Sequence, residues 1–188
     1  MNQTFEELLV SHCAPTLAGM KTGSLFCFRA AAPDAVRHKV GYWHRRLRPR
    51  GLCVVLLLER NAPRQSIVYV YRKSQLEQLL ASKECSCFLR RCGYCPADAD
   101  GMLVQLARRM SREGDFPHEI GVFLGYPLED VIGFIENRGQ NFTCCGFWKS
   151  YSDPAAAQKC FDCYRRCIAC YTRMLSRGVP IEKMTQPA

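Results

Sequence analysis

The sequence predicts an α+β protein with a small, largely antiparallel sheet, segregated helices and a long C-terminal helix. Residues 52–58 form a continuous apolar run, which is typical of a strand buried on both faces. The alternating segment 66–72 is rich in β-branched and aromatic residues and is the expected antiparallel partner, after a turn at 61–64. A segment that begins at Pro154 and ends before Gly178 predicts the long last helix.

The other elements are predicted from apolar spacing and from residues that start or stop helices. Cys13-Ala14-Pro15 is expected to end the first helix, and Pro49 to end a basic one. In chain order the elements are a helix over 4–12, a loop over 17–23, a strand over 24–28, a basic helix over 33–48, a helix capped by Ser74, and a helix over 97–112 with Met102, Leu103, Leu106 and Met110 inward.

The best-specified stretch, residues 115–148, contains two helix starts of the form aromatic-Pro-x-Glu, at Phe116 and at Tyr126. Proline is favoured at the first helical position, and the glutamate two residues later meets the positive end of the helix dipole. The second helix carries three carboxylates that would repel phosphates, which excludes a helix-turn-helix DNA reader. This helix is expected to close at Gly139, before a short extended segment at 144–145, and to bury Val131, Ile132, Phe134 and Ile135.

The length of 188 residues suits one domain, so we expect a single α+β domain over 1–180 and a loose tail over 181–188. The longest apolar run is far shorter than the ~20 residues that a membrane span needs. The N-terminus lacks the basic region of a secretory signal. We therefore expect a cytoplasmic protein with no membrane partner and with thirteen mostly reduced cysteines.

The net charge of +9 is concentrated in residues 37–50, where aromatic residues alternate with basic ones. A solvated helix face explains such a run. An anionic partner explains it as well, either a nucleic acid or a small molecule that bears phosphate or carboxylate. No recognised RNA or DNA module is present, so nucleic acid is the less favoured partner.

Two groups of cysteines have the spacing of metal ligands. The four in 160–170 fall on one helical stripe roughly 15 Å long, which cannot surround one tetrahedral ion, so we interpret them as core residues. The other four lie between helices, where a loop can fold back and the neighbouring Arg90 and Arg91 would lower the thiol pKa values. These candidates for zinc or an iron–sulfur cluster are Cys85, Cys87, Cys92 and Cys95.

Catalysis is suggested by two dipeptides, His12-Cys13 and His118-Glu119, which hold the parts of a thiol nucleophile site. Cys13 would be the nucleophile, His118 the base and Glu119 the nearby acid. The alternative is that His118 is an exposed first-turn residue and Cys13 a packed one. The chain has no serine-hydrolase elbow, no Walker loop, no HExxH motif and no dinucleotide turn.

Several segments, taken together, resemble one family. They are HCAPTLAG from His12 followed by Lys21, VYVYR at 68–72, FPHEIGVFLGYPLEDVIGFI from Phe116, and CCGFWK from Cys144 followed by Tyr151. They are similar to the uncharacterised family catalogued as domain of unknown function 3793, found in anaerobic Firmicutes. The resemblance covers nearly the whole chain and implies a small cytoplasmic protein with no established activity. The cysteines of 85–95 are not part of the family's motif.

Packing does not readily explain ten residues of these segments, and we expect them to converge on a polar, cationic, thiol-bearing site. They are His12, Cys13, Lys21, Arg72, His118, Glu119, Tyr126, Asn137, Cys145 and Lys149. The favoured hypothesis is a pocket near the 115–148 helical pair that binds an anionic small molecule, with Cys13 and His118 available for a thiol-dependent reaction. The alternatives are a zinc or iron–sulfur protein that uses the cysteines of 85–95, and a nucleic-acid-associated protein that uses 37–50. The ligand, the reaction and the oligomeric state are left open.

Overall fold

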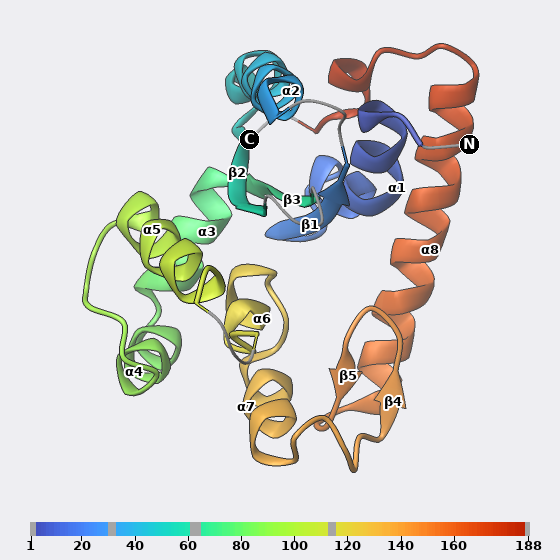
Figure 1. The fold of residues 1–188 in the computed structure, drawn as a ribbon. Coiled ribbons are helices and arrows are strands. Elements are labelled where there is room, and N and C mark those ends of the chain that lie inside the picture. The colour runs from blue at the N-terminus through green and yellow to red at the C-terminus, as the bar shows by residue number, and fades with distance from the viewer. Residues whose placement is uncertain (1–2, 30–32, 61–64, 113–115, 187–188) are drawn as a thin grey trace. The chain divides into compact units, whose positions relative to one another are not determined.

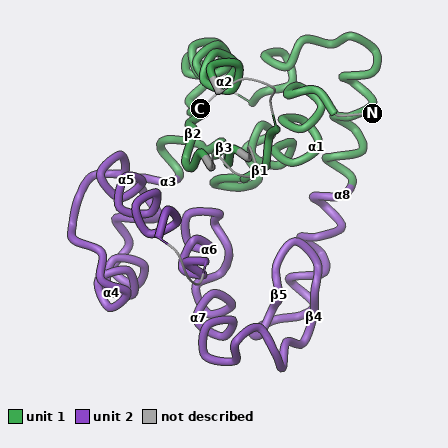
Figure 2. The backbone as a smooth tube through the Cα atoms, in the orientation of Figure 1, with its two compact units in different colours: residues 1–75, 166–188 green, residues 76–165 purple. Residues whose placement is uncertain are grey.

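The computed structural model describes residues 3–29, 33–60, 65–112 and 116–186. It has helices and a small antiparallel sheet, so the predicted α+β class is confirmed. The chain divides into two compact units, which are described separately: unit 1, residues 1–75 with 166–188, and unit 2, residues 76–165 (Figure 2). The expectation of a single domain over 1–180 stays a prediction.

Unit 1 is built on a three-stranded antiparallel sheet in the order β1-β3-β2. Its strands are β1 (Gly23–Phe28), β2 (Leu52–Arg60) and β3 (Gln65–Arg72). The predicted pairing of the apolar run with the alternating segment is confirmed, with a register shift between Leu56 and Leu58. The predicted turn at 61–64 lies outside the described residues.

One face of this sheet is covered by helices α1 (Phe5–Leu17) and α2 (Pro33–Leu47), as Figure 1 shows for unit 1. Alternate residues of β3, Val68 and Val70, point into the same core as Leu9 of α1 and Leu47 of α2. A 3-10 turn, η1 (Arg48–Arg50), connects α2 to β2 and contains the proline that was expected to end the basic helix.

Helix α1 is longer than predicted, because it continues through Pro15 to Leu17. A capping box between Thr4 and Glu7 fixes its start. Its end is a Schellman motif, in which Gly19 has a φ of 79° and the Met20 N–H donates to the Pro15 carbonyl at 2.8 Å. A proline in the last turns removes one helical donor, and the closing hydrogen bonds keep the chain helical around it.

Arg72 joins three parts of unit 1 from a position that is 4% exposed. Its Nε donates to the Thr16 carbonyl at 2.8 Å, and its Nη2 donates to the carbonyls of Leu17 at 2.6 Å and Gln186 at 3.0 Å. A cation at a helix C-terminus also interacts favourably with the helix dipole. Arg72 therefore closes α1 and holds the backbone at Gln186.

The expectation of a loose tail over 181–188 is wrong for the part that is described. Residues Ile181–Met184 form a 3-10 helix, η2, whose Ile181 and Met184 side chains pack in the core of unit 1. Apolar burial and the Arg72 hydrogen bond to Gln186 hold this segment in place. Residues 187–188 lie outside the described residues.

Unit 2 is mostly helical and contains a two-stranded hairpin, which precedes the last α-helix in the chain (Figure 1). Its elements are α3 (Lys73–Ala81), which begins in unit 1, α4 (Lys83–Arg91), α5 (Ala99–Met110), α6 (Ile120–Phe123), α7 (Leu128–Glu136), β4 (Cys144–Cys145), β5 (Lys149–Ser150) and α8 (Pro154–Ser176), which continues into unit 1. The four inward residues predicted for α5 are buried, and Gly139 closes α7 with a φ of 72°.

Three predictions for this part of the chain are corrected. Helix α4 occupies a segment that was expected to be a loop, because Ser82 caps it and its Phe88 and Leu89 are buried. The cysteines of α8 were expected in the core, whereas three of them are half-buried and Cys170 is exposed. On α7 only Val131 of the four apolar residues is fully buried, and Ile135 is exposed.

No helix in the described part of the chain is both long enough and apolar enough to cross a membrane.

We expect Arg72→Met to lower the free energy of unfolding by about 2–4 kcal/mol, because two buried carbonyls and a part-buried one lose their charged donor. Urea denaturation followed by circular dichroism measures this loss. The matched control is Arg173→Met, which removes one positive charge from an exposed position of unit 1. If both variants lose the same small amount, the structural role assigned to Arg72 is wrong.

Candidate functional site

Unit 2 contains a cavity of about 160 Å³ within the helical pair of residues 115–148. Its walls come from the segment before α6, from α6 and α7, and from the hairpin. They are largely aromatic, with Lys149 and His118 as the basic members: Phe116, His118, Ile120, Gly121, Tyr126, Asp130, Val131, Phe134, Trp148 and Lys149.

Close packing of α6 against α7 shapes this cavity. A Cβ at Gly121 would lie 2.7 Å from a methyl carbon of Val131, so a larger residue would force the two helices apart. Gly125, with a φ of 72°, makes the turn between the helices, and Pro127 stands at the N-cap of α7. Pro127 was expected at the first helical position of α7, and it lies one residue before that position.

Asp130, in the first turn of α7, is 2% exposed and accepts five hydrogen bonds from the hairpin and the segment after it. Its Oδ2 accepts from the Trp148 indole N–H at 2.7 Å. Its Oδ1 accepts from the backbone N–H groups of Tyr151 at 2.7 Å and Ser152 at 3.0 Å, and from the hydroxyls of Ser150 and Ser152. These bonds fix the hairpin, with Trp148 and Lys149, against α7.

The pKa of Asp130 is lowered from its ordinary value. Burial alone would raise it, but the hydrogen bonds from Tyr151, Trp148 and Ser152 to the ionised form outweigh burial. Its place in the first turn of α7 adds the favourable field of the helix dipole. Asp130 is therefore a structural anion whose charge is satisfied inside the protein.

The polar atoms of two aromatic residues of the wall, Tyr126 and Trp148, are hydrogen-bonded within the protein. The Tyr126 hydroxyl donates to the Phe147 carbonyl at 3.0 Å, and its ring stacks on Trp148 at a centroid distance of 5.1 Å. Burial raises the pKa of Tyr126 to about 12, so its hydroxyl keeps its proton at neutral pH. These rings therefore contribute mainly apolar surface to the cavity wall.

The basic residues are held by contacts with the same rings. The Lys149 Nζ donates to the Gly139 carbonyl at 2.6 Å and lies 5.8 Å from the centroid of Phe134 and 4.7 Å from that of Phe142. The His118 ring meets the Phe134 ring edge-on, with the centroids 4.9 Å apart. An ammonium group has three donors, so one bond to a carbonyl leaves Lys149 able to bind an anion.

A second recess of about 450 Å³ adjoins the cavity, because Phe116 and His118 line both. It is more polar, with a thiol, a carboxylate and two guanidinium groups in its wall. Its lining residues are Cys92, Arg109, Arg112, Phe116, Pro117, His118, Glu119 and Ile135. We name it the arginine groove.

Glu119, which was predicted as a catalytic acid, is 6% exposed and belongs to an ion pair in the arginine groove. It accepts from Arg109 Nε at 2.7 Å and from the Tyr94 hydroxyl at 3.3 Å. The Arg109 Cζ also lies 4.8 Å from the centroid of the Tyr94 ring. These contacts give Glu119 a structural role in holding Arg109.

Cys92 is the cysteine that the structure brings into one recess with His118 and Glu119. Burial and the neighbouring Glu119 carboxylate raise its pKa, and Arg109 and Arg91 oppose them less strongly. Arg91 lowers the pKa of Cys92, as was expected of the neighbouring arginines, but burial and Glu119 outweigh this effect, so the expected net lowering does not occur. Cys92 is a neutral thiol at neutral pH and a weak nucleophile.

Four of the ten residues that were expected to converge lie in unit 1: His12, Cys13, Lys21 and Arg72. Cys13 is fully buried, and burial raises its pKa far above the ordinary value, although Lys21 opposes the shift. His12 is exposed, with its ring 6.3 Å from that of Phe26. Because Cys13 and His118 belong to separately described units, their use as nucleophile and base stays a prediction.

The other six lie in unit 2, and the structure brings three of them, His118, Tyr126 and Lys149, into the cavity. Asn137 caps α7, where its amide donates to the Gly133 carbonyl at 2.9 Å. Cys145 is exposed on β4, opposite Lys149 in the hairpin. Asn137 and Cys145 do not line the cavity.

The four cysteines that were predicted as metal ligands are placed differently from one another. Cys85 is buried on α4, Cys87 is exposed on the same helix, Cys92 is half-buried and Cys95 is exposed. In the segments that the structure describes, no group of three or more His, Cys, Asp or Glu side chains is arranged to hold a metal ion. The zinc or iron–sulfur hypothesis stays a prediction from spacing, and all thirteen cysteines are free thiols in the structure.

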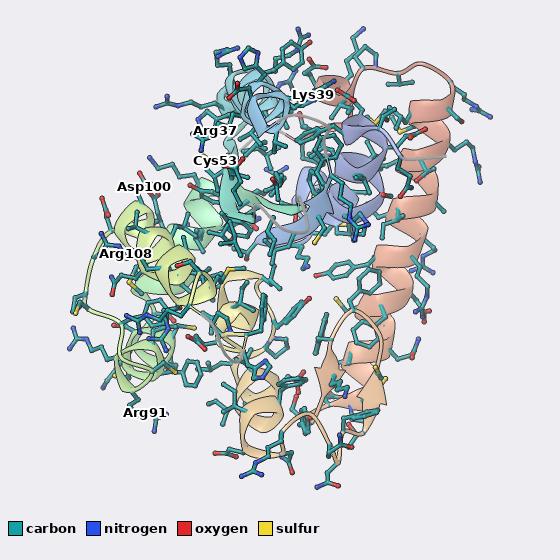
Figure 3. All side chains as sticks on the ribbon, in the orientation of Figure 1. Arg37, Lys39, Cys53, Arg91, Asp100 and Arg108 are labelled. Carbon is teal, nitrogen blue, oxygen red and sulfur yellow. The ribbon has the colours of Figure 1, made fainter. Side chains whose placement is uncertain are left out.

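Much of the basic stretch 37–50 is paired with carboxylates of unit 1. Arg37 binds Glu59 at 2.8 Å and Lys39 binds Glu6 at 2.7 Å; Figure 3 labels both basic residues on α2. Arg46 forms an ion pair with Glu182 of η2. These pairs explain part of the charge concentration without a nucleic acid, whose binding stays a prediction.

Three residues that line the cavity, Asp130, Phe134 and Trp148, were not predicted from the sequence as residues of the site. Asp130 was considered only as a charge that repels DNA, and Phe134 only as a core residue. The usable signal was an acidic residue in the first turn of a helix that begins at a proline, which marks a carboxylate that can bond backbone N–H groups. Nothing in the sequence shows that these groups belong to the distant hairpin.

We expect Asp130→Asn to lower the free energy of unfolding by about 2–4 kcal/mol at neutral pH, because an amide cannot accept all five hydrogen bonds. A group with a lowered pKa stabilises the fold above its unfolded pKa and loses this effect as pH falls through the folded pKa. The difference between wild type and variant should therefore shrink below the ordinary value of 3.8.

Urea denaturation at neutral pH and at about pH 3 measures this effect. Glu129→Gln, at the exposed position next to Asp130, is the matched control and should have little effect. A difference that stays constant, or grows, as the pH falls would contradict the ionised role of Asp130.

Comparison with known proteins gives one match. The model of the family described as "Protein of unknown function (DUF3793)" matches residues 9–185, which is nearly the whole chain. Neither the curated proteins nor the solved structures contain a match.

Proposed function

Because the chain belongs to the DUF3793 family of proteins of unknown function, we propose a function from the site itself: unit 2 binds a small aromatic anion. The observation that supports this most directly is the cavity of about 160 Å³, lined by four aromatic rings and by Lys149 and His118. A cytoplasmic location, in which free thiols stay reduced, is part of the same proposal.

The size of the cavity favours a single ring. An apolar cavity of about 150 Å³ accommodates benzene, whereas most pockets for drug-sized ligands are about 300–1,000 Å³. Ring faces of Tyr126, Phe134 and Trp148 can stack against a planar occupant at low entropic cost, because contacts within the protein already hold these side chains.

The charges favour an anion. Ring faces alone attract cations, so the Lys149 ammonium group decides the sign of the ligand. Asp130, the acidic residue of the lining, does not reverse this preference because five donors already solvate its carboxylate. A carboxylate or phosphate attached to the ring of the ligand would lose some of its hydrogen bonds to water and would accept one from the Lys149 ammonium group instead.

The proposal contains no thiol-dependent step. Cys13 is buried with a raised pKa, and Cys92 in the arginine groove has a raised pKa as well. Both observations favour binding over nucleophilic catalysis by these thiols.

We expect benzoate to bind the full-length protein with a millimolar dissociation constant, and Lys149→Met to weaken it about tenfold through the loss of a charge-assisted hydrogen bond. Isothermal titration calorimetry measures both. Benzyl alcohol, a neutral molecule of similar size, should bind wild type and variant equally.

Lys159→Met is the matched control, since it removes the same charge from an exposed position of α8 outside the cavity lining. Benzoate binding that is absent in wild type, or equal in the wild type and both variants, would refute the assignment of this cavity to an aromatic anion.

A further inference from the structure

We propose that the arginine groove is the second half of the same site and binds a phosphate-type oxyanion on an arm that extends beyond the ring of the ligand. This inference rests on the proposed function and narrows it to a class of ligand. The ligand would be an aromatic compound whose ring occupies the cavity and whose terminal oxyanion lies between Arg109 and Arg112.

Contacts within the protein hold Arg109 in a position from which it can bind such a ligand. Its Nε donates to Glu119 and its guanidinium plane is held near the Tyr94 ring. Among the residues that the structure describes, this is the one hydrogen bond of the guanidinium group. Both terminal nitrogens are therefore available, and they present the paired N–H groups that match two oxygens of a phosphate or carboxylate.

Arg112 adds a positive charge to the groove, in which the Glu119 carboxylate already neutralises the charge of Arg109. The Glu119 carboxylate offsets one guanidinium, and Arg112, which follows the end of α5, lines the same recess. Arg112 is exposed, so it can move onto an incoming anion without breaking a buried contact.

The thiol of the groove does not oppose an anion. A thiolate at Cys92 would add a negative charge next to the guanidinium groups. Burial and Glu119 raise the Cys92 pKa, so the group is neutral at neutral pH.

Because the two recesses share wall residues, we expect that one ligand can occupy both. Phe116 and His118 line the cavity on one side and the groove on the other. Pro117 between them is buried, which fixes the backbone at this point. An arm of a few bonds that passes His118 would connect the ring to the oxyanion, with the imidazole as a further donor.

The test compares two probes, benzoate and 2-phenylethyl phosphate, in isothermal titration calorimetry with the full-length protein. We expect Arg112→Gln to weaken 2-phenylethyl phosphate about tenfold and to change benzoate less than twofold, because only the longer probe reaches the groove. Arg109→Lys should also weaken the longer probe selectively, since lysine keeps the charge beside Glu119 but lacks the paired donors.

Arg108→Gln is the matched control: Arg108 is exposed on α5, where Figure 3 labels it, and it lines neither recess. Equal effects of Arg112→Gln and Arg108→Gln on 2-phenylethyl phosphate would overturn the groove assignment while benzoate binding still supports the cavity. If neither probe binds wild type, the proposed function fails and this inference fails with it.

Discussion

The candidate site depends on one buried carboxylate. Asp130 stands where α7 begins and accepts hydrogen bonds from a tryptophan, two serine hydroxyls and two backbone N–H groups that follow it in the chain. These bonds fix the hairpin against α7, and with it the part of the cavity wall that carries Trp148 and Lys149. A buried charge is costly unless it is fully bonded, and here the bonding also sets the geometry of the site.

A buried charge at a helix end also organises unit 1, but there the charge is positive. Asp130 places a negative charge at the positive end of α7, and Arg72 places a positive charge at the negative end of α1. Each gathers backbone groups from segments that are distant in sequence, and each is almost completely buried. Residues that look like ligand-binding groups in the sequence can thus be structural, as Arg72 and Glu119 are.

The sequence predicted the fold class, the antiparallel pairing of β2 with β3, and the limits of α8, because these follow from local patterns of apolar residues, prolines and glycines. It predicted three cavity residues, Tyr126, Lys149 and His118, of which two lie in the best-specified stretch and Lys149 directly follows it. Helix α4 was missed because four cysteines suggested a metal loop, although Ser82 is an ordinary helix cap. The role of Asp130 as the acceptor of five hydrogen bonds could not be predicted, since it depends on a tertiary contact between α7 and the hairpin.

The aromatic anion that we propose for the cavity would lie beside Trp148. The chain has two tryptophans, Trp43 and Trp148, and each indole N–H donates to a carboxylate, of Glu6 at 3.1 Å and of Asp130 at 2.7 Å. A two-dimensional ¹H–¹⁵N spectrum of the full-length protein, recorded during a benzoate titration, therefore contains both the reporter and its internal control. If the anion binds in the cavity, the Trp148 indole resonance shifts and saturates while that of Trp43 stays in place. A Trp148 resonance that does not move, or equal movement of both, would rule out binding in this cavity.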